Sequence, residues 1–172
     1  MNAKLDFIFK RRSIRKYAAK DIAESALKDI LEAAMAAPSA CAKDPWHFVV
    51  IRESAIRNRI ADGLPTGQML RHAPAGILVC GDIDKAHDHQ ESYMIQDCSA
   101  AIQNVLLAAT ALGLGACWTG VHPRADRVDH IRTALQLPPN IMPLAMISLG
   151  WPAEKPAART RYAAAAVHAN AW

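Results

Sequence analysis

The residues best suited to chemistry in this chain are two groups of arginines near its two ends. The first group is Arg11-Arg12-Ser13-Ile14-Arg15 and the second is Arg159-Thr160-Arg161. Each arginine presents a rigid fork of donors that matches phosphate oxygens, and Ser13 adds a hydroxyl and a backbone N–H. If the fold brings the groups together, they form one anion pocket, and we expect a cofactor phosphate there. A solvated basic patch is the alternative.

The other polar residues do not suggest a set of catalytic acids, bases or nucleophiles. The sequence shows no paired carboxylates, no His-Asp-Ser spacing and no Cys-His signature. Its four cysteines form no CxxC pair, and we expect them to be reduced because a core of this size needs no disulfides. The run His87-Asp88-His89 is more typical of a solvated loop than of a closed ligand set, so we predict no metal.

The composition is that of a globular protein with a sizeable core. The chain has 172 residues, of which 52% are hydrophobic and 21% charged, and we expect residues 1–172 to form a single domain. Its net charge of +4 is spread along the sequence, so we predict no nucleic-acid partner. No signal peptide is visible at the N-terminus, and we therefore expect a cytoplasmic protein.

One segment requires a membrane span to be considered, because no charged residue occurs between Asp97 and Arg124. This segment contains Gln103 and Asn104, and its helical part is expected to end at Gly113 as a left-handed cap. We therefore predict a buried core helix or an interface helix, and no membrane contact.

The elements that must position the arginines begin with two helices. Asn2 is expected to cap a short helix through Phe9, which delivers the first arginine group at its exit. Asp21 followed by Glu24 is a capping-box pattern, and it predicts a second helix through Ala36. The apolar face of that second helix comprises Leu27, Ile30, Leu31 and Ala34.

The rest of the chain alternates between predicted strands and helices. Apolar runs predict strands at 47–52, 75–80, 115–121 and 141–150, and helices are expected at 53–61, 91–112 and 124–135. The apolar positions of 91–112 wrap most of the way around the helix, which implies burial on more than one side. The order of elements predicts an α+β or α/β domain with helices packed on a mixed sheet, and residues 152–172 are expected to form an arm.

Five segments of the chain follow one another in an order and at separations that resemble the nitroreductase family of FMN-dependent homodimeric oxidoreductases. They are Arg11–Tyr17, Ala37–Ala40, Pro45–Val50, Gly113–Gly120 and Arg159–Tyr162. The resemblance covers nearly the whole chain. It implies a three-layer α+β fold with a mixed, mainly antiparallel sheet flanked by helices. It also implies a homodimer that exchanges its C-terminal arms, 152–172, and carries FMN sites at the subunit interface.

The resemblance also implies where the FMN phosphate is held. Arg11, Arg12 and Ser13 would bind the phosphate and the ribityl chain. Arg159 and Arg161 would close on the phosphate from the C-terminal arm.

The flavin ring would be held by three further parts of the chain. Arg15 would lie at the pyrimidine edge, where a cation stabilises negative charge on the reduced flavin. Pro38, Ser39 and Ala40 match a loop that reaches the flavin from the partner subunit. From the residues alone, Ser39 reads equally well as part of a helix-terminating turn.

The segment Cys117, Trp118, Thr119 and Gly120 matches the backbone that lies along the N5 side of the ring, although Trp118 by itself is better interpreted as a core aromatic. The chain departs from the family at Ala42, where an amide side chain is frequent. Around residues 67–70 only Gln68 is suited to a polar contact with the ring edge.

The leading functional expectation is an FMN-dependent reductase with a ping-pong cycle. NAD(P)H would be the transient electron donor, and a small molecule such as a nitroaromatic or a quinone would be the acceptor. Relatives that cleave flavin, remove halogens or reduce alkenes provide one alternative, and a non-catalytic flavin-binding or flavin-storage protein provides another.

Overall fold

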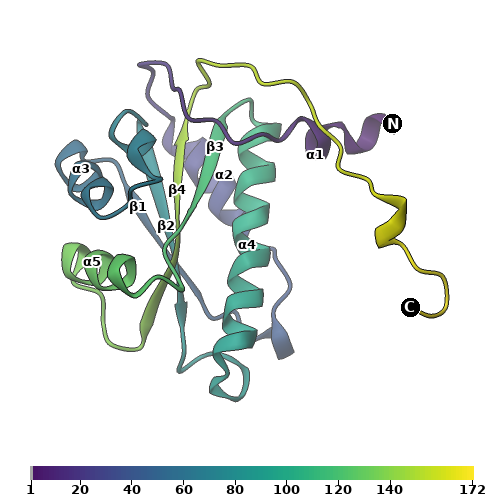
Figure 1. Cartoon of the computed structure of the whole chain (residues 1–172). Coiled ribbons are helices and arrows are strands. Elements are labelled where there is room, and N and C mark those ends of the chain that lie inside the picture. Colours follow the sequence, from purple (N-terminus) through teal and green to yellow (C-terminus); the bar gives the residue numbers. More distant parts are fainter. Residues whose placement is uncertain (1) are drawn as a thin grey trace.

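A four-stranded sheet with the strand order β1-β2-β4-β3 forms the middle layer of the protein (Figure 1). The computed structural model describes residues 2–172. The strands, which are all antiparallel to their neighbours, are β1 (Trp46–Ile51), β2 (Ala75–Asp82), β3 (Gly115–Gly120) and β4 (Ile141–Gly150). The four predicted strands and the mainly antiparallel sheet are confirmed.

Helices cover both faces of the sheet and complete the predicted three layers. In Figure 1, α2 (Glu24–Met35) and α4 (Glu91–Ala111) lie on one face, whereas α3 (Ser54–Asp62) and α5 (Ala125–Leu135) lie on the other. The short helix α1 (Asp6–Lys10) contacts α4. It follows a 3-10 turn at Ala3–Leu5, whose first N–H groups are capped by Asn2, as predicted.

Each face of the sheet has its own hydrophobic core because successive residues of a strand point to opposite sides. In β2, Ile77 and Val79 pack with α2 and α4, whereas Leu78 and Cys80 pack with residues of α3 and α5. All eight residues of β2 are buried, since both faces of this central strand are covered. A strand buried on both faces reads as a continuous apolar run, which is the pattern that predicted it.

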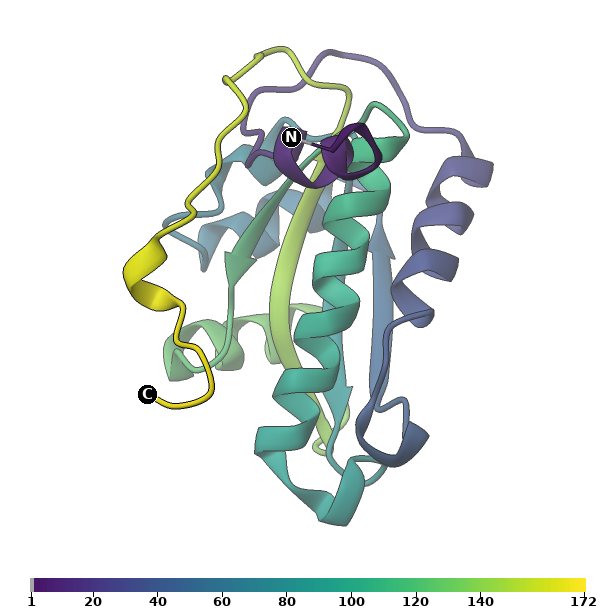
Figure 2. The same cartoon turned by 90° about the vertical axis from the view of Figure 1, so that its right-hand side faces the viewer.

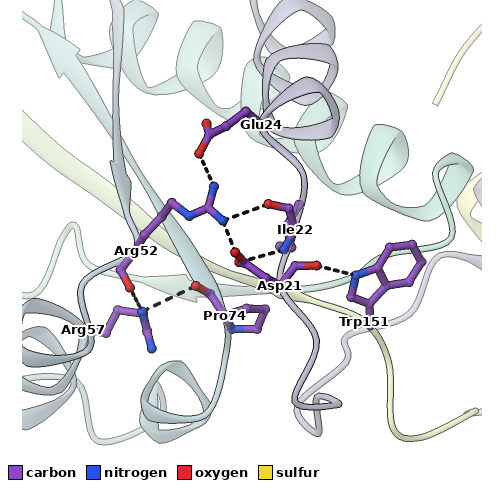
Figure 3. A network of polar contacts seen from close by, with 7 residues as sticks. All are labelled: Asp21, Ile22, Glu24, Arg52, Arg57, Pro74 and Trp151. Carbon is purple, nitrogen blue, oxygen red and sulfur yellow. Dashed lines mark hydrogen bonds and ion pairs between the residues drawn. The ribbon is translucent and has the colours of Figure 1, made fainter.

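The predicted capping box at the start of α2 is wrong, because a residue far along the chain takes both carboxylates. Ala23 occupies the cap position and provides no side-chain hydrogen bond. Asp21 and Glu24 instead pair with Arg52, which also donates to the Ile22 carbonyl (Figure 3). This network fastens the entrance of α2 to the end of β1.

A second arginine extends the same network into the interior. Arg57 is buried and donates to the backbone carbonyls of Arg52 and Pro74 (Figure 3). Burial lowers the pKa of its guanidinium group. On the other side of the network, Trp151 Nε1 donates to the Asp21 carbonyl at 3.0 Å, which joins the chain after β4 to the same corner (Figure 3).

The turn between α4 and β3 has the predicted left-handed glycine cap. Gly113 has a φ of +76°, and the Leu114 N–H donates to the Ala109 carbonyl at 2.8 Å. This pairing closes the end of α4 as a Schellman motif. Strand β3 begins two residues after this cap, at Gly115, and it pairs antiparallel with β4.

The N-terminal segment after α1 lies directly beside β3. The Ile14 N–H donates to the Ala116 carbonyl at 3.0 Å, and Ser13 and Ala116 form an isolated parallel bridge. A Cβ atom at Gly115 would lie 2.7 Å from the Ile14 Cβ, a distance too short for two carbon atoms. The close approach of this segment therefore requires glycine at position 115.

The chain after β4 leaves the three layers as an extended arm. Residues 156–172 are exposed, and the arm runs away from the rest of the protein in Figures 1 and 2. The expectation that 152–172 forms an arm stays a prediction. Within residues 2–172, no helix has the length and apolar character required to cross a membrane.

We predict that Gly115→Ala displaces the N-terminal segment from β3. Overpacking at a rigid Cβ should lower the free energy of unfolding by about 1–3 kcal/mol. The same change should accelerate hydrogen exchange of the Ile14 amide, which loses its acceptor on Ala116.

Gly113→Ala is the matched control. It introduces strain at a positive φ and should lower the free energy of unfolding by about 1 kcal/mol, but no atom lies within 4 Å of its Cβ. The Ile14 amide should therefore keep its protection against hydrogen exchange under conditions in which the protein stays globally folded. Equal Ile14 exchange in the two variants would contradict this account.

Candidate functional site

The first arginine group divides between two sides of an extended segment. Ile14 points into the core and is 7% exposed, and Arg12 lines the same side of the segment, where it donates to the Ala157 carbonyl of the arm. The neighbours of these residues lie on the other side. Arg11, Ser13 and Arg15 all lie near the Cys117 thiol on β3.

The pKa of the Cys117 thiol reflects the charged and polar groups on that side of the segment. Burial raises its pKa, and the guanidinium of Arg15, the hydroxyl of Ser13 and the guanidinium of Arg11 each act in the opposite direction. Two cations and a hydroxyl therefore converge beside the middle of β3. Such a set of donors can bind an anionic group.

The outer edge of β3 continues this donor set along the backbone. β3 pairs with β4 on one side only, and Ala116 directs its carbonyl outward to Ile14. Backbone groups alternate in direction along an antiparallel strand, so Trp118 and Gly120 point their backbone to the same outer edge. The Gly120 carbonyl accepts from Arg127 at 2.7 Å, which leaves its N–H facing outward.

Tyr17 locks the N-terminal segment to the sheet. Its hydroxyl donates to the Ile14 carbonyl at 2.6 Å and lies 2.8 Å from the Ser148 hydroxyl on β4. Burial is the largest influence on this phenol and raises its pKa, so Tyr17 remains a neutral donor. The lock fixes the backbone on which Ser13 and Arg15 are carried.

Glu154 is a site residue that sequence reasoning missed. Its Oε1 accepts from the backbone N–H groups of Arg15 at 2.5 Å and Lys16 at 3.1 Å. The Arg15 N–H is the largest cause of the lowered pKa of this carboxylate, and the charges of Lys16 and Arg15 add to it. The glutamate thereby ties the start of the arm to the first arginine group.

The second arginine group follows this tie within a few residues. Ala157 accepts from Arg12, and two residues of extended chain span at most about 7 Å, so Arg159 starts within reach of the first group. Arg159 and Arg161 are exposed, and neither forms an ion pair among residues 2–172. The structure brings the arm to the first group but leaves these two guanidinium groups open.

The loop between α2 and β1 is strongly bent and internally bonded. The Ser39 hydroxyl pairs with Asp44 Oδ1 at 2.5 Å, and the Ala40 N–H donates to the buried Asp97 of α4 at 2.9 Å. Cys41, Ala42 and Asp44 all have positive φ angles. Asparagine tolerates this conformation better than alanine does, so Ala42 is held in a conformation that alanine disfavours. Pro38 leads into this loop, after α2 ends at Met35.

The side chain of Gln68 is engaged in hydrogen bonds, whereas the side chain of Trp118 is exposed. Gln68 Nε2 donates to the Ala61 and Leu64 carbonyls, and its Oε1 accepts from Arg71, so the amide is occupied inside its own loop. Trp118 is 40% exposed on β3. The interpretation of Trp118 as a core aromatic is therefore wrong, because the edge strand leaves this face uncovered.

Within residues 2–172, no group of three or more His, Cys, Asp or Glu side chains is arranged to hold a metal ion. The site can instead bind an elongated anionic ligand, with cations at one end and free backbone N–H groups along β3.

Comparison with known proteins agrees with this geometry. A sequence profile described as the Nitroreductase family matches residues 8–65 and 62–151. A protein of Methanothermobacter thermautotrophicus, provisionally named NADH dehydrogenase/NAD(P)H nitroreductase, is 43% identical over 168 residues, which are 98% of this chain and 87% of that protein.

Two solved structures show the same fold over the full length. A protein of Parabacteroides distasonis with the same provisional name has a TM-score of 0.94 and 38% identity, with 100% of both chains covered. A protein of Desulfovibrio desulfuricans, provisionally named a nitroreductase and solved in complex with FMN, has a TM-score of 0.86 and 32% identity. That match covers 100% of this chain and 99% of the other.

We predict that the Glu154 tie weakens on acidification. A carboxylate whose pKa is lowered in the folded state stabilises the fold above its ordinary value of 4.5, and this contribution is lost as the pH falls through the folded-state pKa. Glu154→Ala should therefore unfold at lower urea concentration than the native chain near neutral pH, and the difference should shrink progressively below pH 4.5.

Glu53→Ala is the control, because Glu53 is exposed and its side chain does not cap α3. It should show no such pH-dependent difference. A Glu154→Ala difference that keeps its full size in acid would show that the carboxylate charge does not carry the tie.

Proposed function

Because this chain belongs to the nitroreductase family and is an FMN-dependent oxidoreductase, we propose that it carries two electrons from NAD(P)H to a small acceptor in a ping-pong cycle. Nitroaromatics, quinones and similar molecules are the proposed acceptor class. Bound FMN supplies the hydride chemistry, so the protein has to hold it, tune it and leave one face open. The chain 1–172 would act as one domain of a homodimer.

The observation that carries this proposal is the placement of Arg11, Ser13 and Arg15 beside the outer edge of β3. The donors fit FMN in kind, because guanidinium and hydroxyl groups suit a phosphate and outward backbone N–H groups suit the polar edge of a ring. Burial of the Cys117 thiol at the same place excludes a charged sulfur there.

We assign Arg11 and Ser13 to the phosphate end, with Arg159 and Arg161 approaching from an arm. Arg12 is the exception among the predicted phosphate ligands, because its side chain faces the opposite side of the segment and bonds to Ala157. Its proposed role is to hold the arm in position, and direct contact with the phosphate would require it to leave that carbonyl.

Arg15 is assigned to the end where negative charge develops during electron transfer. A fixed cation stabilises such charge without reorganisation, and Glu154 holds the Arg15 backbone in place. The backbone of Trp118 and Gly120 would line the ring edge, while Cys117 and Thr119, both buried, anchor the strand.

The homodimer would complete the site from the second subunit. Pro38, Ser39, Ala40 and Ala42 lie on the bent loop that we propose to contact the partner's FMN. Gln68 is proposed at the ring edge only if it gives up part of its bonding inside the loop at Gly67–Arg71. The exposed arm, with Tyr162 78% and Val167 62% exposed, has apolar side chains suited to a partner surface.

We predict that Arg15→Ala slows FMN reduction by NAD(P)H about 100-fold, because one preorganised positive group at the site of developing charge is lost. Rapid-mixing absorbance under anaerobic conditions measures this rate directly. Lys16→Ala is the matched control, since it removes the adjacent cation, and its rate should stay within about twofold of the native value. Equal rates for native protein and Arg15→Ala would contradict the assignment of Arg15.

We also predict a dimer in sedimentation equilibrium, with a mass of twice 18.7 kDa per assembly. Removal of the arm after Ala157 should shift the assembly toward monomers and weaken FMN binding, because arm contacts and the second arginine group are lost together. A native protein that is monomeric and fully loaded with FMN would contradict the shared site.

A further inference from the structure

A thiol and an imidazole face each other across two loops, and one of these loops also carries Pro38, Ser39, Ala40 and Ala42, which are proposed to contact the partner's FMN. The Cys41 Sγ lies 3.7 Å from His87 Nε2, although the two residues are 46 positions apart. Cys41 belongs to the bent loop before β1, and His87 to the connection between β2 and α4. A nucleophile within reach of a base is the arrangement that activates a side chain for covalent chemistry.

The imidazole is held in place from two further directions. Asp88 Oδ2 lies 3.4 Å from His87 Nε2, so a carboxylate is available to stabilise the protonated ring. The ring of Tyr93, on the first turn of α4, packs against His87 with the centroids 5.2 Å apart. The neighbouring His89 also lines the cavity at this place, and its Nδ1 lies 3.3 Å from the Ile83 carbonyl.

Both loops carry strained backbone at this point. Cys41 has a φ of 49°, and Asp88 and His89 have φ angles of 51° and 52°. Non-glycine residues in this region are uncommon. The strained positions are Cys41 itself and the two residues that follow His87 in the chain.

A cavity of about 500 Å³ opens at the pair, a volume that suits a small molecule. Besides Cys41 and His87, its lining includes the charged residues Lys43, Lys85, Asp84 and Asp88, and also His89. Two cations and two anions together match a zwitterionic ligand better than an apolar or a purely anionic one.

The other three thiols are not available for the same chemistry. Cys80, Cys98 and Cys117 are buried, whereas Cys41 is exposed. Burial raises the pKa of Cys80 and of Cys98 to about 12 and also raises that of Cys117, so these thiols stay protonated. Any selective thiol modification of this chain would therefore be directed to Cys41.

We propose that Cys41 is a site of thiol–disulfide exchange with low-molecular-weight disulfides that carry both ammonium and carboxylate groups, such as glutathione disulfide. His87 accepts the Cys41 proton, and the thiolate attacks one sulfur of the disulfide. A bond forms between Cys41 Sγ and that sulfur while the original S–S bond breaks, and the departing thiolate takes the proton back from His87. The incoming disulfide is the oxidant, so electrons and protons balance.

The groups that the site uses lie on residues 41–43, 84–89 and 93 of one chain, and thiol modification is read by mass, so its failure can be told apart from failure of the flavin assignment. The test is incubation of the full-length protein with glutathione disulfide near pH 7, followed by intact-mass measurement over time. We expect one glutathionyl group per native chain and none on Cys41→Ser.

Two further variants test whether His87 acts as the proton acceptor for Cys41. His87→Gln should slow the reaction about tenfold, because the thiol loses its proton acceptor. His72→Gln should react at the native rate, because His72 is exposed and does not line this cavity. Reaction of the native chain with the neutral 2-hydroxyethyl disulfide should be slower than with glutathione disulfide.

Circular dichroism establishes that each variant is folded before its rate is interpreted. If His87→Gln proves unfolded, the preference of the native protein for glutathione disulfide over the neutral disulfide decides the question. Modification that persists in Cys41→Ser, a folded His87→Gln that reacts at the native rate, an absent preference, or an unreactive native chain would each overturn the proposal.

Discussion

The contact between Ile14 and Gly115 is the constraint on which the proposed site depends. A backbone segment can lie this close to β3 only because residue 115 has no side chain, and the Ile14 N–H then reaches the Ala116 carbonyl. The pairing makes the segment extended, and an extended segment alternates its side chains. Ile14 is therefore directed to the core, and Ser13 and Arg15 are carried on the side of Cys117.

The chain after β4 turns this local pairing into a link between the two ends of the sequence. Ala18 donates to the Trp151 carbonyl, Ala153 donates to the Lys16 carbonyl, and Glu154 accepts from Arg15 and Lys16. An arm that must leave the body is thus fastened at its root by backbone hydrogen bonds and a carboxylate. Its arginines start from a defined place, while the remainder of the arm stays exposed.

Much of the fold could be predicted from the sequence, because local patterns determined the elements. Continuous apolar runs marked β2 and β4, and the glycine cap after α4 followed from Gly113 alone. The capping box failed because a side chain from another element decided the outcome. Asp21 and Glu24 have the right spacing for a cap, but Arg52 offers both carboxylates a charged partner that local spacing cannot reveal.

The candidate site was also predictable only in part, because local spacing does not reveal contacts between residues that are distant in the sequence. The arginine types and their order indicated an anion site, but treating Arg11, Arg12 and Ser13 as one unit overlooked the alternation of an extended segment. Glu154 went unnoticed because its role is to accept from backbone N–H groups, which leave no mark in the sequence. Cys41 and His87 meet only through two bent loops, so no spacing rule could pair them.

The donors beside β3 are proposed to hold FMN and to support two-electron transfer. The most direct measurement is the absorbance spectrum of the purified protein during an anaerobic titration with NADH or NADPH, followed by addition of a nitroaromatic or a quinone. The account predicts flavin bands that bleach with the nucleotide and return with the acceptor. Bands that resist bleaching, or a colourless protein that takes up no FMN, would contradict it.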